Sequence, residues 1–326
     1  MKGFDAVVRM VAAGVLMAVV GSVDAQQAYP SKPIRFIVPF PPGGSTDPMA
    51  RMVAEKLAER WGRPVIVENR PGGNTIIGTE AAAKAPPDGY TILLASPPFV
   101  INPSLLPSLP YDSIKDFDAV ATISKSSIVL VIHPSVPANT LQEFIALAKS
   151  RPGQLNYASA GSGGILNLAG ELFNTMSGAK VQHIPYKGSG ALMSDLIGGQ
   201  VQLSFQIPIS VISHIRSGKL RPVAITCEDR SSVLPEVPTF TEAGLPGYNA
   251  RAWFGIVAPA GTPRTIVGML SGEIRKILTA PDIRKKLSSQ GMDPLISTPE
   301  EFAALIKTDV AQYAKIIKEA NIKAEN

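Results

Sequence analysis

Short apolar runs along this 326-residue chain alternate with stretches in which apolar residues recur every four positions. The first run, residues 34–38, is rich in β-branched and aromatic residues and predicts a buried strand. After it, Met49, Val53 and Leu57 place apolar side chains on one face of a helix. Asp47 precedes this stretch and suits the N-cap of that helix. The pattern therefore predicts a strand followed directly by a helix.

The same alternation continues to the end of the chain. Further strands are predicted over residues 64–68, 91–95, 128–132, 155–158, 181–184, 201–205, 222–225 and 253–258. The carboxyl-terminal part is predicted to be helical over residues 263–278, 281–289 and 298–320. Thr298 and Glu301 have the spacing of a capping box at the start of the last helix. Strands that alternate with helices predict an α/β fold with mostly parallel sheets.

The alternation falls into two runs, one before about residue 125 and one after it. A chain of this length favours two domains. The sequence shows no repeat of about 20–50 residues, which argues against a solenoid.

The first 25 residues have the pattern of a cleavable secretory signal peptide. Lys2 and Arg9 lie before an apolar run of eleven residues, 10–20. This run is too short to span a bilayer, because a membrane-spanning helix needs about 20 apolar residues. Val23 and Ala25 suit the small-residue positions of a cleavage site after Ala25. We expect an exported, soluble mature chain, and the alternative is a buried amino-terminal helix.

Composition and charge exclude several classes of protein. A hydrophobic fraction of 45% with 17% charged residues argues against a disordered chain. The net charge of +5 and the absence of a basic run argue against a nucleic-acid partner. Cys227 is the single cysteine, and the three histidines lack metal-ligand spacing, so we expect no metal and no cofactor. Cys227 is either a small core residue or a reactive thiol.

Two loops, residues 40–47 and 159–164, combine glycines and hydroxyls between a predicted strand and a predicted helix. Helix N-termini carry unpaired N–H groups and a partial positive charge. Glycine lets a ligand approach that backbone closely. Because ligands of open α/β sheets bind at the carboxyl ends of strands, the two loops could hold an anion across a cleft. The alternative is that both loops are tight turns without a ligand.

Enzyme motifs fail when they are tested against the sequence. Gly73 and Gly78 have the spacing of a phosphate loop, but the lysine that should follow is missing. Ser162 resembles the serine of a nucleophile elbow, except that Ala160 stands where the first glycine is required. We therefore expect no catalytic residue and no enzymatic activity. An exported hydrolase or lyase remains the second hypothesis.

Several ordered motifs together resemble one known family. They are Val38-Pro39-Phe40-Pro41-Pro42-Gly43-Gly44-Ser45-Thr46-Asp47, Glu68-Asn69-Arg70-Pro71-Gly72-Gly73-Asn74, Tyr186-Lys187-Gly188-Ser189-Gly190, Gly198-Gly199-Gln200-Val201 and Ala258-Pro259-Ala260-Gly261-Thr262-Pro263. They resemble the extracytoplasmic solute-binding proteins of tripartite tricarboxylate transporters, the Bug or TctC family. The resemblance covers essentially the whole mature chain.

The resemblance implies a two-domain periplasmic binding-protein fold, of the Venus flytrap type, with crossing hinge strands and a ligand cleft between the domains. The expected divisions are a signal peptide at 1–25, a first domain at 26–125 and 253–326, and a second domain at 126–252. The implied location is the periplasm. A regulator's effector domain shares this fold, but it would need a DNA-binding segment before the first strand.

The resemblance also implies the ligand and the partners. The ligand would be a small carboxylate, such as a dicarboxylate, a tricarboxylate, an acidic amino acid or an aromatic acid. The domains would close on it, and the loaded monomer would deliver it to the large and small membrane subunits of a transporter or to a sensor.

Carried onto this chain, the family pattern implies a set of ligand-binding residues in both domains. They are Phe40, Pro41, Gly43, Gly44, Ser45, Thr46, Asp47, Asn74, Ala95, Ser96, Ser159, Ala160, Gly161, Ser162, Gly163, Asn167 and Phe205. Asn167 departs from the family's common histidine, and Gln206 from its common aspartate. Arg251 stands where small or polar residues are common, and we hypothesise that it pairs with a distal carboxylate.

Overall fold

The protein is described by a computed structural model that covers residues 29–43, 46–186, 189–226, 230–231, 233–248, 250, 252–289 and 291–323. The predicted signal peptide lies outside the described residues. So do Gly44 and Ser45 of the first loop, and also Cys227 and Arg251.

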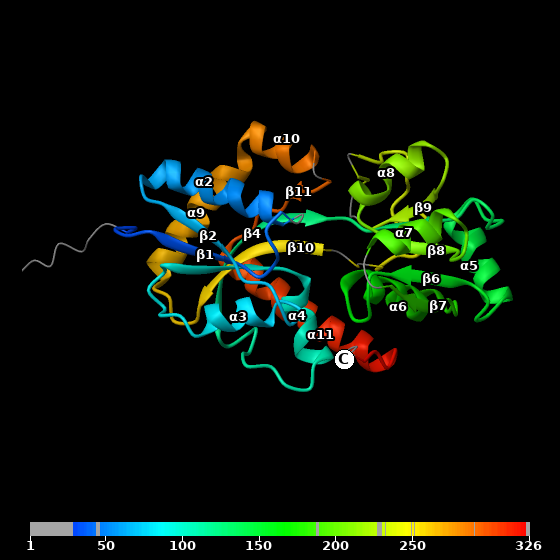
Figure 1. Cartoon of the computed structure of the whole chain (residues 1–326), viewed down its shortest axis with the longest axis horizontal. Helices are drawn as coiled ribbons and strands as arrows, with labels where there is room; N and C mark the ends of the chain where they lie inside the picture. The colour runs from blue at the N-terminus through cyan, green and yellow to red at the C-terminus, as the bar shows by residue number, and fades with distance from the viewer. Residues whose placement is uncertain are drawn as a thin grey trace, which may run out of the picture.

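Two β-sheets, each with its own helices, form the two lobes of the molecule (Figure 1). The six-stranded sheet has the order β11-β4-β10-β3-β1-β2, and the five-stranded sheet has the order β7-β6-β8-β5-β9. The strands of the first sheet are β1 (Ile34–Val38), β2 (Val65–Asn69), β3 (Thr91–Ala95), β4 (Phe117–Ser126), β10 (Ala252–Pro259) and β11 (Asp293–Pro294). Those of the second are β5 (Val129–Ile132), β6 (Asn156–Ser159), β7 (Gln182–Pro185), β8 (Leu203–Gln206) and β9 (Arg221–Ile225).

Both sheets are mixed, which corrects the prediction of mostly parallel sheets. The strand β1 is parallel to β2 and β3, and β6 is parallel to β7 and β8. The antiparallel pairs all involve β10, β4 or β5. These three strands carry the chain out of one sheet or into the other. Of these, β5 and β10 run against the parallel strands of their sheets, because each enters its sheet from the opposite lobe rather than over a crossover helix, whereas β4 runs in the same direction as β1 and β3.

Ten helices within the described residues surround the sheets (Figure 1). In the first lobe they are α2 (Asp47–Trp61), α3 (Ile76–Ala83), α4 (Pro97–Leu105), α9 (Arg264–Thr279), α10 (Pro281–Ser289) and α11 (Pro299–Glu319). In the second they are α5 (Leu141–Ser150), α6 (Ile165–Ser177), α7 (Ser189–Ile197) and α8 (Pro208–Arg216). The predicted capping box of α11 is confirmed, since Thr298 and Glu301 exchange hydrogen bonds. The N-cap of α2 is Thr46 rather than Asp47.

The chain crosses between the sheets twice. It leaves the first sheet at the end of β4 and enters the second at β5, and it returns at the start of β10. The strands β4 and β10 are antiparallel neighbours, and Ala252 lies opposite Ser126. The two crossings therefore lie side by side. On this basis we propose the predicted limits at residues 125 and 252 as the domain boundaries.

Apolar contacts also join the lobes away from the crossings. The largest core cluster contains Leu105 and Tyr313 from the first lobe together with Leu168 and Phe173 from the second. Gly163 lies so close to Leu105 that a Cβ atom built there would sit 2.4 Å from the leucine Cδ2. In the part of the chain that the structure describes, no helix is both long and apolar enough to cross a membrane.

Candidate functional site

A cavity of about 350 Å³ lies between the two lobes. Loops and helix starts of both lobes line it, together with residues of β10. The lining residues are Phe40, Pro41, Thr46, Ser96, Pro97, Pro98, Ser159, Ala160, Gly161, Gly164, Ile165, Leu166, Asn167, Ile207, Ala252 and Phe254. Its volume is in the range of small-molecule sites, which are commonly about 300–1,000 Å³.

Four helices begin at this cavity, two from each lobe. Thr46 and Ser96 are the N-caps of α2 and α4, and Gly164 and Ile207 are the N-caps of α6 and α8. None of these four N-caps makes a side-chain capping hydrogen bond. Each helix start carries roughly half a positive charge from its aligned peptide dipoles. Together they make the cavity favourable for an anion.

The first predicted loop is organised by the carboxylate of Asp47. Its Oδ2 atom accepts from the Gly43 backbone N–H at 3.1 Å and from Arg51 Nε at 2.9 Å. Its Oδ1 atom accepts from Asn69 Nδ2 at 3.0 Å, and Asn69 also donates to the Phe40 carbonyl. The hydrogen bond from Arg51 is the main reason why the pKa of Asp47 falls to about 2, with Asn69 and Gly43 assisting against burial. Asp47 thus holds the loop and does not line the cavity.

The second predicted loop is organised by Asn167. Its Oδ1 atom accepts from the Gly163 backbone N–H at 2.8 Å, and its Nδ2 atom donates to the Tyr157 hydroxyl at 2.7 Å. Tyr157 donates in turn to Glu171 Oε1 at 2.5 Å. Burial, and then the Glu171 carboxylate, raise the pKa of Tyr157 well above its ordinary value, so this hydroxyl stays a donor. The Asn167 side-chain amide is therefore committed to the loop itself.

The Ser159 side chain, at the start of the second loop, forms a hydrogen bond with His183. Its Oγ atom lies 2.7 Å from the Gly161 carbonyl oxygen and 2.6 Å from His183 Nε2. Only the hydroxyl can donate to a carbonyl, and it has one hydrogen. His183 Nε2 is therefore the donor in the second contact. The His183 ring also lies against Tyr157, with ring centroids 4.9 Å apart.

Two hydroxyl groups on the first lobe's side face the cavity without a protein partner. Ser96 and Thr46 line the cavity and are 1% and 6% exposed. Among the described residues, neither hydroxyl makes a hydrogen bond to another group of the protein, and neither residue has an interaction beyond those described. Buried hydroxyls normally have a partner. These two are therefore free to bind a ligand.

The structure brings about half of the predicted site residues to the cavity. Those that line it are Phe40, Pro41, Thr46, Ser96, Ser159, Ala160, Gly161 and Asn167. Those that are described but do not line it are Gly43, Asp47, Asn74, Ala95, Ser162, Gly163 and Phe205. Gly44 and Ser45, like Arg251, lie outside the described residues.

Three of the residues that do not line the cavity are held elsewhere for clear reasons. Phe205 is fully buried among aromatic rings, 6.2 Å from Tyr157 and 5.9 Å from Phe173 between centroids. Asn74 donates through Nδ2 to Asn102 Oδ1 at 2.8 Å, and its own carbonyl accepts from Asn102. Ala95 belongs to the apolar core at the end of β3.

Several lining residues were not predicted. They are Pro97, Pro98, Ile165, Leu166, Ile207, Ala252 and Phe254, whereas Gly164, which also lines the cavity, belongs to the predicted loop 159–164. The starts of α4 and α8 do carry a sequence signal, because a proline follows directly after a strand at Ser96-Pro97 and near Ile207-Pro208. Ala252 and Phe254 carry no such signal, since they reach the cavity as part of the returning strand β10.

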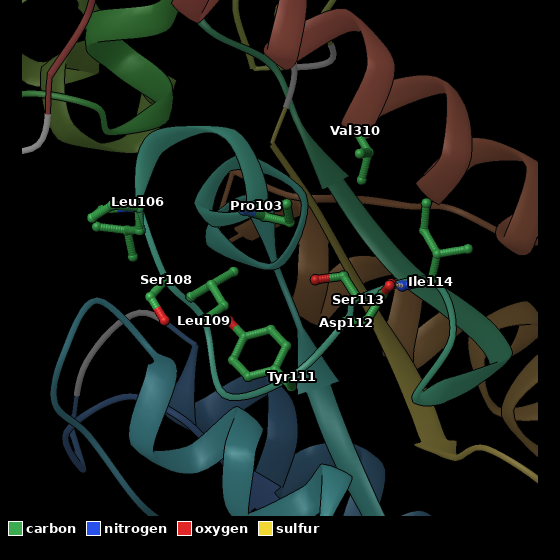
Figure 2. A pocket seen from close by; sticks show the side chains of 10 residues that line it. Pro103, Leu106, Ser108, Leu109, Tyr111, Asp112, Ser113, Ile114 and Val310 are labelled. Atoms are coloured by element: carbon green, nitrogen blue, oxygen red, sulfur yellow. Dashed lines mark hydrogen bonds between the residues drawn. The ribbon is translucent and has the colours of Figure 1, made fainter.

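A second cavity, of about 360 Å³, lies between α11 and the segment that joins α4 to β4 (Figure 2). Val310 lines it from α11, and Leu109 and Tyr111 line it from the joining segment. Among its polar residues, Asp112 and Ser113 are hydrogen-bonded to backbone groups of the same segment and of α4, whereas the buried Tyr111 hydroxyl has no hydrogen-bond partner in the described part of the chain. No predicted site residue lines this cavity. We therefore take the cavity between the lobes as the candidate site.

Charged side chains and metal ligands are absent from the lining of the candidate site. None of its described residues is Asp, Glu, Lys, Arg or His. Over the described ranges, no three His, Cys, Asp or Glu side chains gather where a metal ion could bind. The chemistry available at the site is therefore that of backbone N–H groups, hydroxyls and apolar surface.

Comparisons with known proteins place these features in a family context. The model of the tripartite tricarboxylate transporter family receptor, TctC, matches residues 49–322. Protein BugT of Bordetella pertussis is 40% identical over 314 residues, which cover 95% of this chain and 96% of that protein. A solved structure of a periplasmic transporter is 42% identical, with a TM-score of 0.75, and covers 91% of this chain and 100% of that chain.

A further solved structure, that of R. palustris Rpa4515 with adipate, is 32% identical with a TM-score of 0.76. It covers 91% of this chain and 100% of that chain. Likeness over nearly the whole described chain confirms the predicted α/β fold, a two-domain periplasmic binding-protein fold with a cavity between the domains.

Proposed function

The chain belongs to the tripartite tricarboxylate transporter family of receptors, TctC, and from this premise we propose that it captures a small carboxylate between its two domains. Membership confirms the resemblance drawn from the sequence motifs. The family is one of receptors rather than enzymes. A relative solved with adipate supports a carboxylate as the ligand.

The observation that carries this proposal is the meeting of four helix N-termini at a cavity whose described lining residues include no charged side chain. Each helix start contributes about 0.3–1 kcal/mol to anion binding, and up to about 2 kcal/mol when buried. Each hydrogen bond from an N–H group to a carboxylate adds about 1.5–3 kcal/mol. A micromolar affinity, about −8 kcal/mol, is within reach of these contributions.

The role we propose is delivery from the periplasm. The predicted signal peptide would export the chain, and the two domains would close on the ligand. The loaded protein, as a monomer, would then present the ligand to the membrane subunits of a tripartite transporter or to a sensor. The family's description as a transporter receptor supports this partner class.

A thermal-shift screen of the mature protein, from Gln26, tests the carboxylate proposal. The protein is unfolded and refolded first, so that any co-purified ligand is removed. Each carboxylic acid is compared with its neutral amide at constant pH and salt. A ligand at a hundred times its Kd adds about 2.7 kcal/mol to the stability, which raises Tm by several degrees.

We expect acids to raise Tm and their amides to leave it unchanged. Equal shifts for acid and amide would show that the cavity does not recognise a carboxylate. A loss of acid with formation of product during incubation would favour the hydrolase or lyase hypothesis instead.

A further inference from the structure

The four helix starts at the cavity differ in the donors that they offer. The second residue of α2 is Pro48, α4 begins with Pro97 and Pro98, and α8 begins with Pro208. Proline has no backbone N–H, so its ring stands where a donor would be. The next N–H of α4 is also engaged, because Phe99 donates to the Ser96 carbonyl.

The helix α6 is the exception, since no proline stands in its first turn. Its first intrahelical bond runs from Leu168 N–H to the Gly164 carbonyl. The N–H groups of Ile165, Leu166 and Asn167 therefore lack an acceptor within the helix. All three residues line the cavity. One carboxylate headgroup can be held here by several donors at once.

A hydroxyl group on the first lobe is also available to bind a carboxylate at this cavity. Ser96 lines the cavity and is 1% exposed, yet its hydroxyl makes no hydrogen bond within the part of the chain that the structure describes. The Ser96 residue is enclosed by protein except at the cavity, so a ligand oxygen in the cavity can accept a hydrogen bond from this hydroxyl. Thr46 offers a second such hydroxyl.

The remaining walls of the cavity are apolar. They are formed by Phe40, Pro41, Pro97, Pro98, Ile207, Ala252 and Phe254. A second carboxylate placed against these walls would lose its hydration without gaining a cation or a set of N–H donors from the described residues that line them. An unpaired buried charge is among the most unfavourable arrangements in a protein. An apolar ligand body, in contrast, gains from burial in the same place.

We propose that the ligand of this protein is a monocarboxylate with an apolar body, either an aromatic ring or a medium-length hydrocarbon chain. The carboxylate binds the start of α6 and the Ser96 hydroxyl, and the body lies against the proline and phenylalanine walls. This inference rests on the proposed function and deepens it, because it selects one class among the carboxylates. It also separates this chain from its relative solved with adipate, which is a dicarboxylate.

Two matched ligand pairs test this class by isothermal titration calorimetry on the refolded mature protein. Hexanoate is compared with adipate, and benzoate with terephthalate, so that each pair differs by one carboxylate on the same skeleton. We expect the monocarboxylate to bind at least tenfold more tightly in the pair whose body fits the cavity. Equal or tighter binding of the dicarboxylate would overturn the inference and leave the proposed function intact.

The absence of binding by any carboxylate, including malate and citrate, would overturn the proposed function and this inference with it. Binding of malate or citrate alone would overturn only the inference.

A charged variant tests where the body lies. Ile207→Arg places a cation on the apolar wall, and we expect it to shift the adipate-to-hexanoate affinity ratio at least tenfold toward adipate. Ile209→Arg is the matched control, because Ile209 lies in the first turn of α8, which Ile207 caps, and is 49% exposed but does not line the cavity. An equal shift of the affinity ratio in both variants would contradict the placement of the ligand body against Ile207.

Arg251→Ala tests the sequence hypothesis that Arg251 pairs with a second carboxylate. We expect no change in the affinity ratio, and a selective loss of adipate binding would overturn the monocarboxylate class.

Discussion

At the scale of single residues, the polar side chains of the two loops stabilise the loops rather than contact the ligand. Asp47 accepts three hydrogen bonds, one of them from the backbone N–H of Gly43, and Asn167 makes two that hold the turn at Gly163. The ligand is left with backbone N–H groups and hydroxyls. Such groups are placed by the fold, so their positions depend on these loop contacts.

The Asp47 carboxylate predicts a pH dependence of stability. Its pKa is about 2 in the folded protein, below the ordinary value of 3.8. A lowered pKa means that the ionised form stabilises the fold above about pH 4, and that this contribution is lost as the pH falls toward 2. Asp47→Asn should therefore lower the free energy of unfolding by about 1–2 kcal/mol at pH 7.

Denaturant unfolding from pH 7 to pH 2 measures this effect, and the difference between the two proteins should shrink below pH 4. Asp282→Asn is the control, since Asp282 is an exposed carboxylate in the first turn of α10. If the difference in the free energy of unfolding between wild type and Asp47→Asn stayed the same at pH 2, the charge of the carboxylate would not be the cause of that difference.

His183 is predicted to position the start of the second loop. It donates to Ser159 Oγ, which in turn donates to the Gly161 carbonyl. Loss of one such hydrogen bond costs about 0.5–1.5 kcal/mol, so His183→Ala should raise the Kd about two- to tenfold. His183→Gln, which keeps a donor, should recover part of the affinity.

The matched control for this prediction is His133→Ala. His133 also contacts a serine, with its Nδ1 atom 2.7 Å from Ser135 Oγ, but this pair does not line the cavity. Equal losses in both histidine variants would mean that the effect is one of general stability.

The sequence identifies residues at the strand ends better than it identifies where their side chains point. Ser159 and Ser96 are correctly expected at the ends of β6 and β3, and both line the cavity. Phe205 also lies near a strand end, but every residue of β8 is buried. A strand covered on both faces has no alternation of polar and apolar residues, so its sequence does not reveal which side faces the ligand.

At the scale of elements, the starts of the helices decide what the cavity can bind. Proline in the first turn of α2, α4 and α8 removes donors without disturbing the helix. The start of α6 keeps its donors. A single change at α6 should therefore alter binding more than it alters folding.

Ile165→Pro tests the role of α6. Ile165 is the first residue of the helix, and Gly164 before it is extended with ψ 162°, so a proline fits this position. The change removes one N–H donor to the carboxylate, worth about 1.5–3 kcal/mol, and the Kd should rise about tenfold or more. Calorimetric titration with the acid identified in the thermal-shift screen measures it.

Two controls accompany this variant. Ile165→Ala keeps the N–H while it removes the side chain, and Arg264→Pro places a proline at the exposed first position of α9. If Ile165→Ala weakens binding as much as Ile165→Pro, the side chain rather than the N–H group is responsible.

The order of most elements follows from the hydrophobic pattern, but the strands β4 and β11, the helices α4 and α8 and the directions of the strands do not. The helix α4 was not predicted, because Pro97, Pro98 and Pro103 break the usual helical signal although the first two suit a helix start. The mixed direction of the sheets depends on the two crossings between lobes. These are contacts between segments far apart in the chain, and local pattern does not report them.

At the scale of the whole molecule, the cavity exists because the chain crosses between the lobes twice. The crossings bring Ala252 and Phe254 of β10 beside loops that lie about a hundred residues or more away in the sequence. The start of α6 and the Leu105 side chain meet at Gly163, and α11 contacts α6. The N–H donors of α6 on the second lobe and the Ser96 hydroxyl on the first lobe therefore act together only when the lobes are close.

The central claim is that a carboxylate is bound between the two lobes, and small-angle X-ray scattering tests it most directly. The refolded mature protein is measured without ligand, with a saturating amount of the acid that stabilises it, and with the corresponding amide. We expect the radius of gyration to decrease with the acid and to stay unchanged with the amide. An acid that binds by calorimetry but leaves the radius of gyration unchanged would contradict capture by closure of the two domains.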